Sequence, residues 1–181
     1  MKRLLSVLLC ICMVMTLIPG VGAEIAGDGS ENNPYLISSV ADLQAFAANV
    51  NSGTSYSGKF VKLTASLDLT GVEWTPIGKS GYEFEGTFDG GYHIITGLSI
   101  DTQNRYVGLF GKLENATVKK LGIENAEIIA GDSDVAILAG NAQGGLIENC
   151  YVTGSVVGSA GVGGILGSTH SSEYETTIKN C

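Results

Sequence analysis

The chain has 181 residues, which is the size of one domain, and 44% of them are hydrophobic. Its 18 acidic residues outnumber its 10 basic residues and give a formal net charge of −8. Because the sequence shows no basic patch, this acidity argues against nucleic acid as a partner. Cation binding is one use of an acidic surface, but we favour high solubility as the reason for it.

The N-terminus has the pattern of a secretory signal peptide. Basic residues at 2–3 are followed by an apolar run over residues 4–18, and small residues precede a cleavage site after Ala23. An uncleaved membrane anchor is the alternative, but the apolar run is shorter than the ~20 residues of a membrane span. We therefore predict a signal peptide at 1–23 and a mature chain, 24–181, that is secreted, extracellular and carried at the cell surface. Loss of the two basic residues takes the formal net charge from −8 to −10.

A single helix is predicted over residues 39–51, after a polar lead-in at 24–37. Ser39 can cap this helix, and Asp42 follows three residues later, as in a capping box. The apolar residues at i, i+3, i+4 and i+7 share one face of the helix, and they are Leu43, Phe46, Ala47 and Val50. We interpret residues 24–85 as a lead-in and cap segment, because an uncapped stack of strands would expose its core and its strand edges.

Two short strands are expected after the helix, at 60–63 and 66–69. Leu67 and Leu69 have the spacing of Leu98 and Ile100, which predicts that they begin the same ladder of stacked side chains. Trp74 is predicted to pack where the cap meets the first coils. Stacking on a sugar ring is an alternative role for this tryptophan.

Residues 86–181 form a degenerate repeat. The clearest copies are Gly108-Leu109-Phe110-Gly111, Ile137-Leu138-Ala139-Gly140 and Gly164-Ile165-Leu166-Gly167, and a weaker copy is Gly86-Thr87-Phe88-Asp89. A second apolar block follows each copy with a spacing of three and then two residues. The blocks are Ile95, Leu98 and Ile100, then Val118, Leu121 and Ile123, then Ile147, Cys150 and Val152, and finally Ile178 and Cys181.

This repeat is a strand unit, because its segments are short, rich in Val, Ile, Thr and Leu, and separated by Gly, Asn and Ser. One coil cannot bury its own apolar row, whereas stacked coils place equivalent side chains in contact about 4.8 Å apart. The sequence therefore predicts an all-β fold, a right-handed parallel β-helix (β-solenoid) with a short N-terminal capping helix. The cap segment would cover 24–85 and the coils 86–181.

Four segments of the repeat resemble the GLUG-motif repeats of bacterial secreted and surface proteins: residues 86–95, 107–111, 147–156 and 163–167. Residues 27–30 and 33–37 resemble the segment that often precedes such repeats. The resemblance implies the right-handed parallel β-helix, and it implies an adhesin-like surface protein or the repeats found beside IgA-peptidase domains. Ala139 departs from the pattern, which expects a large residue, and the resemblance therefore implies looser packing at that copy.

The two cysteines of the mature chain, Cys150 and Cys181, lie one coil apart. A secreted pair could form a disulfide, but their ladder holds leucines in the earlier coils, so we favour free, buried thiols that act as small hydrophobic residues. Asn149 and Asn180 precede them and are predicted to stack at a coil corner, where amides pair along the axis.

Several acidic residues and two histidines are candidates for metal binding or catalysis. Asp132, Asp134 and Glu127 come closest to a calcium site, but a solvated turn fits better because the pattern lacks the glycine and distal glutamate of an EF-hand. Asp101, Glu124 and Glu127 could share one face of a β-helix and act on glycans. His93 is expected to make a turn contact and His170 to lie in an exposed loop at 169–175, and neither belongs to a zinc or triad pattern.

The sequence thus predicts no catalytic residues, no cofactor-binding residues, no metal site and no cofactor. We predict a non-catalytic extracellular β-solenoid module that acts as a spacer or adhesive scaffold of a bacterial protein. The alternative is an accessory N-terminal region of a larger secreted enzyme, either a peptidase or a glycan-active β-helix enzyme. The expected partners are a host or cell-wall glycan or protein, with no membrane span in the mature chain. Because the chain stops at Cys181 inside a copy of the repeat, further C-terminal domains are expected.

Overall fold

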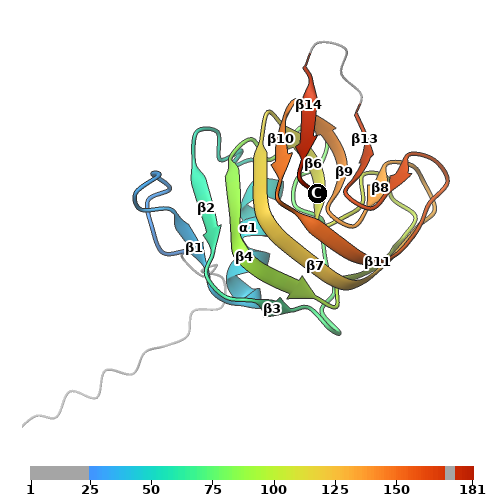
Figure 1. Cartoon of the computed structure of the whole chain (residues 1–181), viewed down its shortest axis with the longest axis horizontal. Helices are drawn as coiled ribbons and strands as arrows, with labels where there is room; N and C mark the ends of the chain where they lie inside the picture. Colours follow the sequence, from blue (N-terminus) through green and yellow to red (C-terminus); the bar gives the residue numbers. More distant parts are fainter. Residues whose placement is uncertain (1–24, 170–173) are drawn as a thin grey trace, which may run out of the picture.

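The computed structural model describes residues 25–169 and 174–181, and it contains one helix and fourteen strands in that part of the chain (Figure 1). The first elements are β1 (Tyr35–Ile37), α1 (Val40–Asn51), β2 (Phe60–Leu63), β3 (Leu67–Asp68), β4 (Thr87–Thr96), β5 (Ser99–Thr102) and β6 (Phe110–Glu114). The later ones are β7 (Thr117–Ala130), β8 (Val135–Ala136), β9 (Ala139–Gln143), β10 (Gly145–Glu148), β11 (Tyr151–Val157), β12 (Val162–Gly163), β13 (Leu166–Ser168) and β14 (Thr176–Lys179).

Each pair of these strands is parallel, and the strands stack into coils. The main sheet has nine strands and follows the order β1-β2-β4-β7-β10-β14, with β3 paired to β4 and with β5 and β11 paired to β7. Two smaller sheets, β13-β9-β6 and β12-β8, form other sides of the stack. Figure 1 shows the coils following one another from β1 and β2 to β14. The predicted parallel β-solenoid is confirmed, and its stacking begins at β1, before residue 86.

Side chains of successive coils line up in ladders inside this stack. The longest ladder follows the main sheet and consists of Tyr35, Val61, Phe88, Val118, Ile147 and Ile178. Its four central members are at most 1% exposed. A parallel rung therefore brings like side chains into contact, and their burial is what stabilises a coil that could not fold alone.

The coils turn at residues with left-handed backbone conformations. Lys120 and Asn125, with φ of 54° and 55°, divide the long strand β7 into three faces. Asn149 and Asn180 both have φ of 53°, and the Asn180 amide donates to Asn149 Oδ1 at 3.4 Å. Asparagine tolerates this conformation better than most residues. The predicted asparagine stack at a coil corner is confirmed.

The helix α1 closes the first coils, as predicted. Ser39 and Asp42 form a capping box, since each side chain accepts from the other's backbone N–H. Phe46 projects from the helix into an aromatic cluster, with ring centroids 5.0 Å from Tyr56, 5.4 Å from Phe84 and 5.9 Å from Phe88. These contacts join the helix to the stack in one continuous core.

The repeat register is confirmed for the later coils and wrong for the earliest one. Val118 pairs with Ile147 and then Ile178, and Ile123 pairs with Val152, as predicted. The copies at 108–111, 137–140 and 164–167 also align, since Phe110, Ala139 and Leu166 occupy one ladder. Ala139 is fully buried between its larger neighbours.

The block of Ile95, Leu98 and Ile100 does not match Val118, Leu121 and Ile123. Instead, Phe88 pairs with Val118, Ile95 with Ile123 and Ile100 with Ile128. The predicted ladder from Leu67 to Leu98 is wrong for the same reason, because Leu67 pairs with Ile95.

The cause of this shift is a longer corner in β4. Three residues, 90–92, separate Asp89 from His93, whereas Lys120 alone separates their partners Lys119 and Leu121. The two extra residues change the spacing of the true block, Phe88, His93 and Ile95, from three and two to five and two. The unrelated residues Ile95, Leu98 and Ile100 happen to keep the original spacing, so counting selects the wrong block.

The weaker copy at 86–89 is also wrong as a relative of 108–111. Phe88 lies in the main sheet, and the residue that stacks on Phe110 from the preceding coil is Ile77. The repeat therefore begins earlier than expected, at the segment that contains Ile77. Pro76 and the single isolated bridge of Ile77 make this segment hard to recognise as a strand.

Candidate functional site

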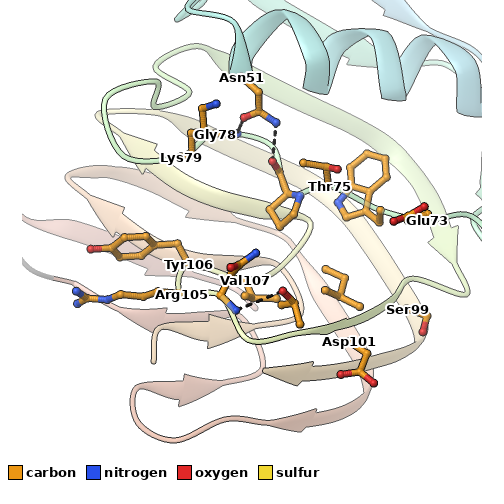
Figure 2. A pocket seen from close by; sticks show the side chains of 15 residues that line it. Asn51, Glu73, Thr75, Gly78, Lys79, Ser99, Asp101, Arg105, Tyr106 and Val107 are labelled. Atoms are coloured by element: carbon orange, nitrogen blue, oxygen red, sulfur yellow. Dashed lines mark hydrogen bonds between the residues drawn. The ribbon is translucent and has the colours of Figure 1, made fainter. Parts of the chain in front are cut away.

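A surface groove lies between the loop that follows β3 and the outer edge of β5. It has a volume of about 570 Å³. Its lining comes from the segments 73–79 and 99–107 together with Asn51 at the end of α1 (Figure 2). These segments belong to adjacent coils, so the groove is a gap in the stack and not a fold of one loop.

The groove exists because the chain leaves the stack too early in one coil. β3 pairs with β4 through Leu67 and Asp68, and Leu69 N–H still donates to the Thr96 carbonyl at 2.8 Å. The Asp68 carboxylate then accepts from Thr70 N–H at 2.9 Å, which forms an Asx turn. Gly71 follows with φ of 73°. The chain therefore turns away just before it would reach the side of β5.

The wall opposite β5 is firmly held. Trp74 Nε1 donates to the Leu109 carbonyl at 3.2 Å, and Ile77 N–H donates to the same carbonyl at 3.0 Å. Asn51 holds the next residues from the helix side: its amide donates to Pro76 O, and its Oδ1 accepts from Gly78 N–H, each at 3.0 Å. Figure 2 shows both bonds of this asparagine. The cap thus positions the wall of the groove.

Trp74 packs where the cap meets the coils, as predicted. The side chain is only 6% exposed, and its indole N–H is already bonded. This low exposure disfavours the alternative of sugar stacking.

Basic side chains occupy one end of the groove. Arg105 Nε donates to Asp134 Oδ2, and its guanidinium lies 4.6 Å from the ring of Tyr106. The hydrogen bond to Asp134 raises the pKa of Arg105 above its ordinary value. Lys79 stands across the groove. Acidic side chains occupy the other end, where Glu73 and Asp101 lie (Figure 2).

The predicted calcium candidates are separated by this arrangement. Asp134 is 2% exposed and paired with Arg105, so the expectation that it forms part of a solvated turn is wrong. Asp132 and Glu127 are exposed. Among the residues that the structure describes, no three His, Cys, Asp or Glu side chains are grouped to hold a metal.

The other acidic candidates fall on two faces. Asp101 and Glu127 lie on the outer side of neighbouring strands, since Ser99 pairs with Glu127. Glu124 stands before the Asn125 corner and accepts from Tyr151 Oη at 2.6 Å, a bond that raises the pKa of that tyrosine. The three carboxylates therefore do not all share one face, as the sequence suggested.

The two thiols are free, and only one is buried. Cys150 is 2% exposed, and burial raises its pKa to about 12. Cys181 is exposed, so the prediction of two buried thiols is wrong for this residue. Cys181 covers Cys150, whereas no described strand stacks on Cys181.

His93 does not line the groove. His93 follows the Gly90-Gly91-Tyr92 corner, half-buried, and its ring lies against Gly91. This agrees with the predicted turn contact. His170 lies outside the described residues.

Sequence reasoning did not predict the groove itself. The signal that could have predicted it is the Asp68-Leu69-Thr70-Gly71 sequence, which is typical of an Asx turn that ends a strand. The position of the groove also depends on the register of the adjacent coil, which the spacing of apolar residues predicts incorrectly.

The fold and its ladders define the class of the protein as a parallel β-solenoid. The family model for the GLUG motif matches residues 138–157, which cover β9, β10 and β11. The resemblance to GLUG-motif repeat proteins is confirmed.

Known proteins with similar sequences are much longer than this chain. Halomucin of Haloquadratum walsbyi is 37% identical over 161 residues, which is 81% of this chain and 2% of halomucin. An immunoglobulin A1 protease of Streptococcus pneumoniae is 33% identical over 160 residues, which is 86% of this chain and 8% of the protease. The chain therefore spans only a small part of the curated relatives it matches.

A solved structure shares the fold. The crystal structure of a candidate immunoglobulin A1 protease from Bacteroides ovatus is similar with a TM-score of 0.70 and 27% identity. The similarity covers 86% of this chain and 48% of that one. Relatives of this kind indicate an extracellular location. In the described part of the chain, no helix has the length and apolar character needed to cross a membrane.

Proposed function

We propose that this chain is a non-catalytic, extracellular β-solenoid module of a larger bacterial surface or secreted protein, where it acts as a spacer and adhesive scaffold. The observation that carries the proposal is the continuous main ladder, which joins six coils from β1 to β14 and buries its four central side chains. Force applied along the axis of such a stack is carried by the backbone hydrogen bonds that join each coil to the next. A module of this kind separates neighbouring domains rigidly, as a flexible linker cannot.

The similarity to regions of large proteins supports the same role. The segments of halomucin and of the pneumococcal protease that are similar to this chain make up 2% and 8% of those proteins. A segment used in this proportion, in proteins of different kinds, fits a structural module better than a shared active site.

The test is single-molecule force spectroscopy on residues 24–181 held between two marker domains. Val118 and Ile147 stack in adjacent coils, so one coil contains about 29 residues and should release about 100 Å of chain when it detaches. We expect several such steps at resolvable force. Extension in one smooth, low-force rise would contradict a mechanical scaffold.

A second candidate is favoured by the structural similarity to the protease from Bacteroides ovatus. The module would then be an accessory region that binds substrate for a peptidase domain elsewhere in the polypeptide. Biolayer interferometry of residues 24–181 against immunoglobulin A1 separates the candidates. Saturable binding without cleavage favours the accessory role, and no binding up to the solubility limit leaves the scaffold.

A further inference from the structure

One strand within the stack has an open backbone edge. Among the described strands, β5 pairs only with β7. The carbonyls of Leu98 and Thr102 accept from Glu127 and Gly131 of the β7 side, each at 2.9 Å. Because backbone groups alternate in direction along a strand, those of Ser99 and Asp101 point to the opposite edge. That edge forms one side of the groove.

An open edge inside a solenoid differs from an ordinary surface. The preceding coil would normally supply a strand here, but it turns away at Thr70 and Gly71. The wall at Trp74, Thr75 and Pro76 then stands beyond the gap and is held by the Asn51 and Leu109 bonds. The groove therefore lies where a strand of the preceding coil would otherwise be. β5 forms one side of it, and the wall at residues 74–76 forms the other.

We propose that this groove binds an extended polypeptide segment of another protein, which pairs with the Ser99–Thr102 edge as an added parallel strand. An extended peptide is the ligand that presents N–H and C=O groups at the spacing of a strand edge. The parallel direction follows from the stack, since every neighbouring rung runs that way. This inference does not depend on the scaffold role and concerns a different surface from the main ladder.

The charges of the groove specify the peptide further. Glu73 lies on the side where β5 begins, and Asp101 is the third residue of that strand (Figure 2). Lys79 and Arg105, which also pairs with Asp134, lie on the side toward which the chain runs. A parallel peptide would place its N-terminal part beside the carboxylates and its C-terminal part beside the cations. The expected ligand therefore carries a basic residue followed, about five positions later, by an acidic one. Six residues in extended form span about 20 Å, so such a peptide would reach beyond the end of β5 at Thr102.

The test uses an acetylated, amidated peptide of sequence Ser-Lys-Val-Thr-Val-Thr-Glu-Ser and the protein of residues 24–181. Calorimetry measures its affinity, and amide chemical shifts locate the site at Ser99 and Asp101. Two variants of the peptide carry backbone N-methyl groups, one on both valines and one on both threonines. In an added strand alternate amides face β5, so one variant should lose at least about tenfold in affinity, as expected for two hydrogen bonds, and the other should bind unchanged.

A second arm changes the protein. Asp101→Pro removes an N–H that points into the groove and leaves the bonds to β7 in place, so it should weaken binding about tenfold while the melting temperature changes little. Asp101→Asn is the matched control, since it keeps the N–H and removes the charge, and it should cost less than about threefold. A peptide with Lys and Glu exchanged should bind more weakly than the parent.

The outcomes decide the proposal. Loss of binding in one methylated peptide and in Asp101→Pro, with retention in the controls, supports strand addition. Equal loss in both methylated peptides, or in neither, overturns it. Absence of binding by the parent peptide at millimolar concentration also overturns it, as does displacement of the peptide by cellohexaose with shifts at the same amides, which would assign the groove to a glycan.

Discussion

The main ladder makes a quantitative prediction about stability along a single row of side chains. Phe88, near its centre, is fully buried, whereas Ile178, at β14, is 47% exposed. Truncation to alanine at each position should therefore have different costs, although the two residues occupy equivalent places in the repeat. The comparison tests whether burial by neighbouring coils stabilises the fold.

The magnitude for Phe88→Ala follows from its surroundings. The ring stacks on Phe46 at 5.9 Å and meets Phe110 edge-on at 5.4 Å, so its removal leaves a cavity where the cap joins the coils. A buried Phe→Ala change costs about 3–5 kcal/mol in the free energy of unfolding. For Ile178→Ala, about half of the side chain is already in water, and the loss should be about 1 kcal/mol.

Urea unfolding of residues 24–181, followed by circular dichroism, measures both. With a slope of about 2 kcal/mol per molar urea, Phe88→Ala should lower the midpoint by about 2 M and Ile178→Ala by about 0.5 M. Tyr92→Ala is the control in the same strand, because Tyr92 is 72% exposed, and it should shift the midpoint by no more than about 0.3 M. Equal shifts for Phe88→Ala and Ile178→Ala would refute the reasoning.

Three further predictions concern the cap, a corner and the thiols. Hydrogen bonds from Ser38 and Ser39 lower the pKa of Asp42 in the folded protein. The stabilisation by this carboxylate is therefore present above the ordinary carboxyl pKa of 3.8 and is lost as the pH falls through the lower, folded value. Asp42→Asn should remove this pH dependence in thermal melts from pH 2 to 5 and cost about 1 kcal/mol at neutral pH. Lys120→Asn should raise the urea midpoint slightly, by up to about 0.5 M, because asparagine relieves the left-handed backbone strain and continues the asparagine stack. At pH 8, iodoacetamide should label Cys181 and leave Cys150 unmodified in the mass spectrum until urea is added, since burial raises the pKa of Cys150 to about 12.

Local signals in the sequence were sufficient for the cap and for the later coils. The capping box at Ser39 and Asp42 depends on residues three positions apart, and the structure forms it as predicted. The match of Val118 with Ile147 works because their corners have the same length, with Lys120 and Asn149 at equivalent places. Period counting is reliable where corners do not change.

The coil of β4 could not be predicted in the same way. Its corner holds Gly90 and Gly91 in excess of the later corners, and the side chains themselves give no sign of which residues bulge out. The turn at Thr70 has a similar effect, because it removes a strand from the stack where a repeat would predict one. The turn at Thr70 opens the groove, and the longer corner of β4 hides the register of the coil beside it. Neither irregularity is visible as a departure in hydrophobic pattern.

The irregular coil is therefore where specificity would arise in this fold. A regular rung has its backbone groups paired above and below, so it presents only side chains of low diversity to a partner. At β5 one edge stays open, and natural strands at such an edge are commonly protected by charge. Asp101 provides a charge there, and Glu73 adds a second on the facing loop. A partner strand without a basic residue would leave the negative charges of these two carboxylates unpaired. The residues that discourage unspecific pairing would therefore also select a peptide of complementary charge.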